Sequence, residues 1–266
     1  MRRTREDPAY EWKQPINFYG KVVDENNEPV SEATVDFEWN DLSEQGTSSS
    51  QTMSDNLGFF SLRDEKGKRL YVQVQKDGYY TSRRTGVAFE YANPATGLFR
   101  PDSNNPVIFH LRKKGPGVDL VTSKFGIKLS FPIHIPRDGT PIMVDLLQRK
   151  TGQTGQLQIS ESKPEYAEWQ QATNWSFRME IPDGGFIEQN DEFPFEAPEN
   201  GYEPVVEFNF EKGTGDWVQH IKKSYYLKFG SPPRYGRLQI ETGISYGGAI
   251  LTYAINPDGS RNLEAK

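Results

Sequence analysis

The stretches INFYGKVVDENNEPVSEATVDFEW (residues 16–39) and SDNLGFFSLRDEKGKRLYVQVQKDGYY (residues 54–80) decide the fold of this chain. Over residues 33–39, apolar Ala, Val, Phe and Trp side chains alternate with polar ones, and residues 70–74 repeat the pattern. Such a period of two places successive side chains on opposite faces of a strand. Asn, Asp, Gly and Pro fill the intervening segments and favour turns. Short strands joined by turns indicate an all-β domain.

The same alternation returns in NPVIFHLRK, residues 105–113, which predicts a closing strand. Roughly seven strands in about 100 residues are typical of a small Greek-key sandwich. Residues 41–53, DLSEQGTSSSQTM, interrupt the pattern. We expect them to lengthen one loop, which is exposed over the Ser-rich part Gly46–Ser50.

Several spacings in this region agree with one known family. They are G-x-V-x-D, then P-V-x-x-A-x-V, then D-x-x-G-x-F-x-L, then a strand that leads into G-Y. The positions that carry them are Gly20, Val22, Pro29, Val30, Ala33, Val35, Asp55, Gly58, Phe60, Leu62, Gly78 and Tyr79. Residues 16–114 therefore resemble the carboxypeptidase regulatory-like domain. Glu32 departs from the family, which usually has a small residue there, often Gly.

The resemblance implies a transthyretin-like β-sandwich with Greek-key topology. Domains of this family accompany metallopeptidases, outer-membrane receptors and bacterial surface proteins, as folding or interaction modules. The matching residues are turn formers and core residues, so the resemblance carries over no catalytic role.

A domain boundary is expected at Gly115-Pro116-Gly117, because these residues cannot continue the preceding strand. We therefore assign residues 1–14 to a flexible N-terminal tail, residues 15–114 to the first β-sandwich and residues 118–266 to a second domain.

The second domain also has the pattern of a β protein. Eight segments are predicted as strands, namely residues 125–131, 142–148, 155–160, 174–181, 204–210, 224–229, 235–241 and 249–255. Eight strands suit a second sandwich, and a jelly roll is the suggested arrangement. Residues 164–172 are predicted as one short helix that starts at a proline. The fold class is thus all-β, with two tandem β-sandwich domains.

The composition and the absence of motifs argue against several classes of catalytic and metal-binding site. The chain has no Cys and 3 His, without the paired spacing of a zinc hydrolase. No Ser lies in a G-x-S-x-G motif. The net charge of −6 disfavours general binding to nucleic acid. We predict a protein that is not an enzyme and needs no cofactor, apart from the Ca²⁺ alternative below.

Localisation is expected to be extracytoplasmic, in the periplasm or at the cell surface of a bacterium. The first 15 residues are polar and lack the apolar core of a signal peptide. We therefore expect an export signal or anchor upstream of this sequence, and contact with a membrane only through such an anchor.

Aromatic residues of the second domain are the candidate ligand-binding residues. Their rigid rings stack on sugars at low entropic cost. The candidates are Trp169, Trp175, Tyr202, Trp217 and Tyr226. The alternative is that these side chains fill the core of the sandwich. In the segment 224–229, alternation predicts that at most one of the two adjacent tyrosines is exposed.

Acidic residues cluster between Glu180 and Glu211, a segment with ten carboxylates and no Lys or Arg. One interpretation is a solvated acidic face. The other is a Ca²⁺ site, because hard cations prefer clustered oxygen ligands. The candidate ligands are Asp183, Glu188, Asp191 and Glu192.

Together these features predict a non-catalytic, extracytoplasmic binding or interaction protein, with a polysaccharide or another envelope protein as partner of the second domain. One alternative is a self-assembling surface or filament subunit that forms homo-oligomers through strand edges or through its N-terminal tail. Another is a glycosidase, because this chemistry needs only two carboxylates at a set separation.

Overall fold

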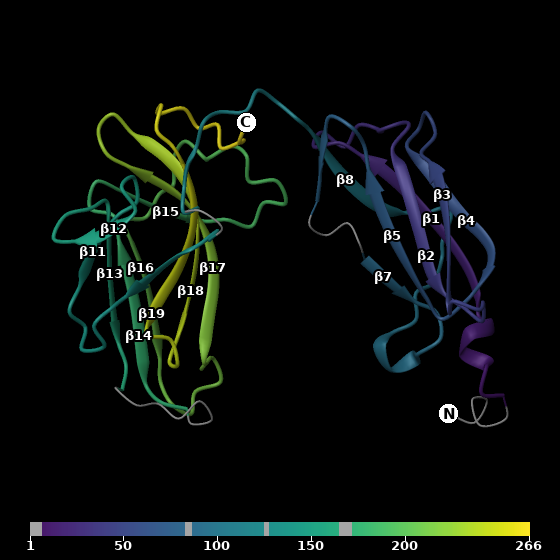
Figure 1. Ribbon diagram of the computed structural model, residues 1–266, viewed down its shortest axis with the longest axis horizontal. Helices are drawn as coiled ribbons and strands as arrows, with labels where there is room; N and C mark the ends of the chain where they lie inside the picture. Colours follow the sequence, from purple (N-terminus) through teal and green to yellow (C-terminus); the bar gives the residue numbers. More distant parts are fainter. Residues whose placement is uncertain (1–6, 83–86, 125–127, 165–171) are drawn as a thin grey trace. The chain divides into compact units, whose positions relative to one another are not determined.

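The structure, a computed structural model, describes residues 7–82, 87–124, 128–164 and 172–266. The chain divides into two compact units, Met1–Gly115 and Pro116–Lys266 (Figure 1). Strands dominate both units, which confirms the all-β fold class. Within the described ranges, no helix reaches the length and apolar character of a membrane span.

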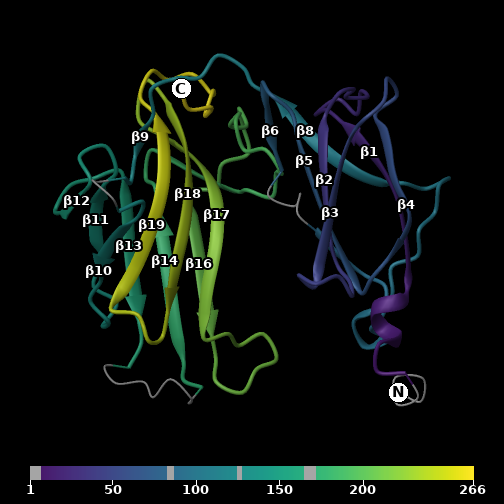
Figure 2. The same cartoon turned by 45° about the vertical axis from the view of Figure 1, so that its right-hand side comes forward.

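The first unit is a sandwich of two four-stranded sheets (Figure 2). Its strands are β1 (Pro15–Val23), β2 (Thr34–Asn40), β3 (Thr47–Met53), β4 (Phe59–Lys66), β5 (Arg69–Gln75), β6 (Tyr79–Thr81), β7 (Val87–Glu90) and β8 (Val107–Lys113). One sheet has the order β4-β1-β8-β6 and the other β3-β2-β5-β7. The pair β1–β8 is parallel and the other pairs are antiparallel.

An aromatic core joins the two sheets. The Phe18 ring lies within 6.3 Å, centroid to centroid, of five other phenylalanine rings. Leu70, Val72 and Val74 of β5 are fully buried beside them. Because strand side chains alternate, burial of these residues turns the polar residues of every strand outward.

Strand β3 corrects the expectation of an exposed loop at Gly46–Ser50. Residues Thr47–Met53 pair with β2 along its whole length, from Asn40↔Thr47 to Thr34↔Met53. The strand lies at the edge of its sheet and buries no side chain. It is held by its backbone hydrogen bonds to β2. A polar edge strand lacks the hydrophobic pattern by which strands are predicted.

Residues near the N-terminus contact the first unit. A 3-10 helix, η1, spans Tyr10–Lys13. Glu11 forms an ion pair of 2.7 Å with Lys68, whose ammonium also lies 5.6 Å from the centroid of the Trp12 ring. These contacts differ from the flexible tail expected over residues 1–14, of which residues 1–6 lie outside the described ranges.

Two backbone positions explain family features of the first unit. Gly20 lies in β1, where a Cβ atom would collide with the Phe60 ring. Glu32 has a φ of 52°, in the left-handed region that glycine adopts at least cost. The family's usual Gly at this position is thus accounted for by the backbone conformation.

The second unit is a sandwich of a six-stranded and a five-stranded sheet. Its strands are β9 (Val121–Thr122), β10 (Phe131–His134), β11 (Ile142–Asp145), β12 (Lys150–Gly152), β13 (Leu157–Ser162), β14 (Trp175–Glu180), β15 (Gly184–Glu188), β16 (Val205–Phe210), β17 (His220–Phe229), β18 (Arg234–Gly243) and β19 (Gly248–Asn256). The larger sheet runs β10-β19-β18-β17-β15, with β9 beside β19, and the smaller β12-β11-β13-β14-β16.

Strands β17, β18 and β19 form a meander within one sheet, which differs from the suggested jelly roll. The strand expected at residues 125–131 begins instead at Phe131, and residues 125–127 lie outside the described ranges. Strands β9, β12 and β15 were not predicted, because they are short and weakly patterned. The helix expected over residues 164–172 falls almost wholly on residues that the structure does not describe.

A buried ion pair lies inside the second unit. The Lys163 Nζ atom donates to Glu161 Oε2 at 2.8 Å and to the Gly243 carbonyl at 2.9 Å. Both charged side chains are completely buried. Burial raises the pKa of Glu161 and lowers that of Lys163, while each charge opposes the shift of the other. Each group therefore depends on its partner to remain charged.

The variant Glu32→Gly should raise the free energy of unfolding of the first unit by up to about 1 kcal/mol, because glycine removes the left-handed strain but costs some chain entropy. Urea unfolding followed by circular dichroism measures the change. Glu32→Ala is the control, since alanine keeps a Cβ atom and should give no gain. An equal gain in both variants would contradict a role for the backbone angle.

Removing one partner of the buried pair should destabilise the second unit. We expect Lys163→Met to lower the free energy of unfolding by about 3–5 kcal/mol, and Glu161→Met/Lys163→Met together to restore most of it.

In Lys163→Met the pKa of Glu161 rises further, so the folded state loses stability relative to wild type as pH rises above the ordinary pKa of 4.5. Thermal unfolding at a series of pH values tests this. A double variant as unstable as the single one would refute the coupling.

Candidate functional site

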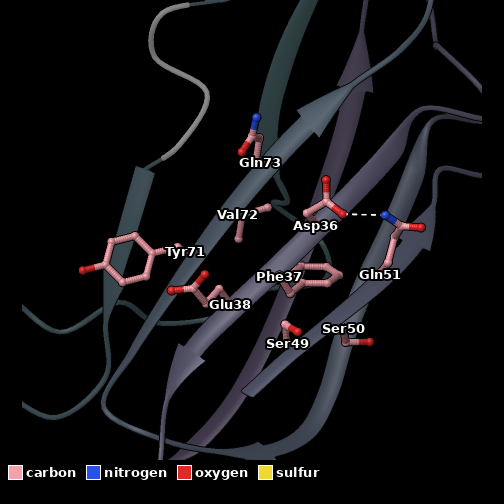
Figure 3. A pocket seen from close by; sticks show the side chains of 9 residues that line it. All are labelled: Asp36, Phe37, Glu38, Ser49, Ser50, Gln51, Tyr71, Val72 and Gln73. Atoms are coloured by element: carbon pink, nitrogen blue, oxygen red, sulfur yellow. Dashed lines mark hydrogen bonds between the residues drawn. The ribbon is translucent and has the colours of Figure 1, made fainter. Parts of the chain in front are cut away.

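A groove of about 660 Å³ lies on the outer face of the first unit, over β3, β2 and β5 (Figure 3). Ligand sites of roughly 300–1,000 Å³ are common in proteins. The groove is lined by Asp36, Phe37, Glu38, Ser49, Ser50, Gln51, Tyr71, Val72 and Gln73. It combines acidic, amide, hydroxyl and aromatic groups on one face.

Strand register places these groups in two rows. Asp36 on the central strand β2 is opposite Gln51 on β3 and Gln73 on β5. Glu38, two residues further along β2, is opposite Ser49 and Tyr71. Since residues two apart share a face, both rows point outward, away from the aromatic core.

The first row is held by hydrogen bonds. The Gln51 Nε2 atom donates to Asp36 Oδ1 at 2.6 Å, as the dashed line in Figure 3 shows. Gln75 Nε2 donates to the other carboxylate oxygen of Asp36 at 3.4 Å. Both oxygens of Asp36 are thus engaged at the floor of the row, which fixes the orientation of its carboxylate.

The second row is less constrained. The Tyr71 side chain is 38% exposed, and Arg69 Nη1 lies 3.5 Å from its hydroxyl. Arg69 is held in turn by Glu90, whose carboxylate lies 3.2 Å from Arg69 Nε. The Glu38 side chain is exposed and forms no hydrogen bond or ion pair with any residue in the described ranges. The row therefore offers an open aromatic ring beside a carboxylate that is available to a ligand.

This arrangement suits binding better than catalysis. Carboxylate groups accept hydrogen bonds from hydroxyls, and amide N–H groups donate hydrogen bonds to them. A tyrosine ring packs against the apolar face of a sugar. A glycosidase needs a general acid kept protonated by its surroundings. Glu38 is exposed to solvent and Asp36 is held as an acceptor, so neither is placed for that role.

Two of the predicted aromatic candidates are wrong because they are buried. Trp175 is 3% exposed and Tyr226 is 1% exposed, so neither ring can stack on a ligand. The Trp175 indole donates to the Val218 carbonyl at 2.9 Å, and the Trp217 indole donates to the Thr173 carbonyl at 2.8 Å. These reciprocal bonds give both tryptophans a structural role.

The other candidates are placed less favourably than expected. Trp217 is half-buried against the main core of the second unit. Tyr202 is half-buried against Tyr226 and Tyr235, and its hydroxyl donates to the Pro198 carbonyl at 2.8 Å. Trp169 lies outside the described residues. The structure thus brings together Tyr202 with Tyr226, and Trp175 with Trp217. These four described candidates form no common platform.

Tyr225 and Tyr226 are both buried, which agrees with the expectation that at most one of them is exposed but not with Tyr226 as a ligand-binding candidate. The face of β17 that carries Tyr226 is covered by a second, smaller cluster with Ala197, Tyr235 and Leu263. The Tyr226 hydroxyl donates to Asp191 Oδ2 at 2.6 Å, and burial raises the pKa of this tyrosine. A sheet covered on both faces hides residues of either parity.

The acidic candidates do not form a cation site. Glu188 pairs with Lys223 at 2.6 Å, and Asp191 accepts from Tyr226. Asp183 lies in the turn before β15, at the opposite end of that strand from Glu188. Across the part of the chain that the structure describes, no group of three or more His, Cys, Asp and Glu residues could hold a metal ion. The interpretation as a Ca²⁺ site of Asp183, Glu188, Asp191 and Glu192 therefore has no geometric support.

Sequence reasoning missed the groove because it sought the ligand site in the second domain. The signal was present in the outward positions of two well-predicted strands, Asp36 and Glu38 on one and Tyr71 and Gln73 on the other. Their pairing was not evident, because β2 and β5 are separated by β3 and β4 in the chain.

Comparisons with known proteins describe the fold of the first unit. Residues 17–99 match the family model of the carboxypeptidase regulatory-like domain. The chain matches no curated protein. Among solved structures, it is similar to 3-chlorocatechol 1,2-dioxygenase from Rhodococcus opacus, with 15% identity, 38% of this chain and 60% of that chain covered, and a TM-score of 0.29.

A streptococcal ancillary pilin is also similar, with 11% identity, 80% of this chain and 53% of the pilin covered, and a TM-score of 0.27. In both cases the matched region spans less than two thirds of the known structure. Neither similarity is close enough to carry a functional argument. The family match, in contrast, confirms the resemblance seen in the sequence: the first unit carries a carboxypeptidase regulatory-like domain over residues 17–99.

Proposed function

We propose that this chain is a non-catalytic, extracytoplasmic binding protein, and that the groove on its first unit binds a neutral polysaccharide. The observation that carries the proposal is the pair of rows across β3, β2 and β5, which place an exposed tyrosine beside carboxylate, amide and hydroxyl groups.

The chemistry of the groove favours a sugar chain over other ligands. Hydroxyl groups of a sugar can donate to Glu38 and accept from the amides of Gln51 and Gln73, while the Tyr71 ring packs against the C–H face. Charged ligands are less favoured. Asp36 and Glu38 would repel anions, and the groove lacks the dense carboxylate cluster that a strong cation site needs.

The extracytoplasmic location rests on composition and on the family match. The chain has no Cys, and its first unit matches the carboxypeptidase regulatory-like family, whose resemblance implies an association with bacterial surface proteins. A polysaccharide of the cell envelope or its surroundings is the partner class that fits both the groove and this location.

Replacement of Tyr71 by Ala should weaken the binding of a neutral oligosaccharide about tenfold, because the stacking surface is lost while the polar groups remain. Isothermal titration of the full chain with cellohexaose, xylohexaose and mannohexaose measures the affinity. Glu38→Gln, which keeps the shape of the side chain, should weaken binding less.

Tyr19→Ala is the matched control, because Tyr19 lies on the outer face of the opposite sheet. It should bind these oligosaccharides as wild type does. If the wild-type chain binds none of the three sugars, or if Tyr71→Ala and Tyr19→Ala reduce binding equally, the groove is not the site.

A further inference from the structure

The opposite face of the first unit has a different chemistry. Outward positions of the sheet β4-β1-β8-β6 carry mainly aromatic and cationic side chains, with Asp64 and Glu65 at the end of β4. They include Tyr19, Lys21, Phe59, Arg63, Ile108 and Tyr80. Phe59 is 39% exposed and Ile108 is 46% exposed, so part of this face is apolar and open to solvent.

Cations cover the rings of this face. The Lys21 ammonium lies 5.1 Å from the centroid of Phe59, directly across the β1–β4 pair. The Arg63 guanidinium lies 5.3 Å from the centroid of Tyr19. Lys114, just after β8, lies 5.3 Å from the ring of Tyr80. These cation–π contacts hold flexible cationic side chains in fixed places on the sheet.

Three cationic side chains of this face have no ion-pair partner among the described residues. Lys21, Arg63 and Lys114 form no ion pair with any carboxylate in the described ranges. The chain as a whole carries a net charge of −6, so these cations have the minority sign. A face with uncompensated charge of the minority sign attracts ligands of the opposite sign.

We propose that this face binds a polysaccharide that carries carboxylate groups, such as a polymer of uronic acids. Carboxylates would meet Lys21 and Arg63 through charge-assisted hydrogen bonds, and the sugar C–H groups would pack on the exposed Ile108 side chain. The outermost strands β4 and β6 are separated by about 14 Å, at about 4.8 Å per strand spacing, which suits an extended chain over a single sugar.

Single-stranded nucleic acid fits this face less well. Proteins bind it by stacking bases on open aromatic rings. Here the cations occupy the positions over the rings of Tyr19, Phe59 and Tyr80, where a base would stack. An anionic ligand that meets the cations themselves is therefore favoured.

This proposal is independent of the neutral-sugar site, because the two sites lie on different sheets. Polygalacturonate is the anionic probe, and dextran is the neutral one. In affinity electrophoresis, polygalacturonate should retard the wild-type full chain at low salt, and the retardation should fade towards about 0.5 M salt as charges are screened. Lys21→Glu/Arg63→Glu should reduce the affinity at least about tenfold.

The matched control is Lys150→Glu/Lys212→Glu, which changes the net charge equally but replaces exposed lysines of the second unit. It should bind polygalacturonate nearly as wild type does. Lys21→Gln/Arg63→Gln is a milder second variant, and thermal unfolding shows that each variant is folded. Tyr71→Ala should retain the binding of polygalacturonate, which separates this site from the groove.

Three results would overturn the proposal. One is an absence of retardation of wild type by polygalacturonate at low salt. Another is an equal loss in the two pairs of Glu variants, which would indicate an effect of net charge alone. The third is binding of polyphosphate, but not of polygalacturonate, by the Lys21 and Arg63 face, which would assign it to a phosphate polymer.

Discussion

The packing of Phe18 is the constraint on which the first unit depends. Its ring contacts aromatic side chains from both sheets, including Phe37 of β2 and Phe60 of β4. The Phe60 ring also fills the space above Gly20, its neighbour across the β1–β4 pair, so it constrains the register of these two strands. A strand cannot turn one residue inward without turning its neighbours outward. The aromatic core therefore determines which polar residues the unit presents to solvent.

Two outer faces of opposite character result from this constraint. One carries Asp36, Glu38 and Tyr71 in a groove, and the other carries Lys21 and Arg63 over aromatic rings. The outward side chains of these faces do not pack in the core. Core packing therefore does not determine which residue types occupy these positions. A small sandwich with two such faces presents two chemically distinct surfaces to solvent.

The sequence predicted strands well where one face is buried and the other solvated, as in β2 and β5. It failed for β3, whose pairing rests on backbone hydrogen bonds without a buried face, and for the exposure of Tyr226, since a second cluster covers the outer side of β17. The groove itself needed the pairing of β2 with both β3 and β5. Long-range strand pairing is not contained in local periodicity, so the residues of the groove were predictable one by one but not as a site.

The central claim is that ligand binding occurs on the outer face of the first unit. Hydrogen–deuterium exchange of the full chain, with and without a saturating neutral oligosaccharide, tests it most directly because it reports every backbone segment at once. The account predicts slower exchange in β2, β3 and β5, over residues 34–40, 47–53 and 69–75. Protection confined to strands of the second unit would contradict it.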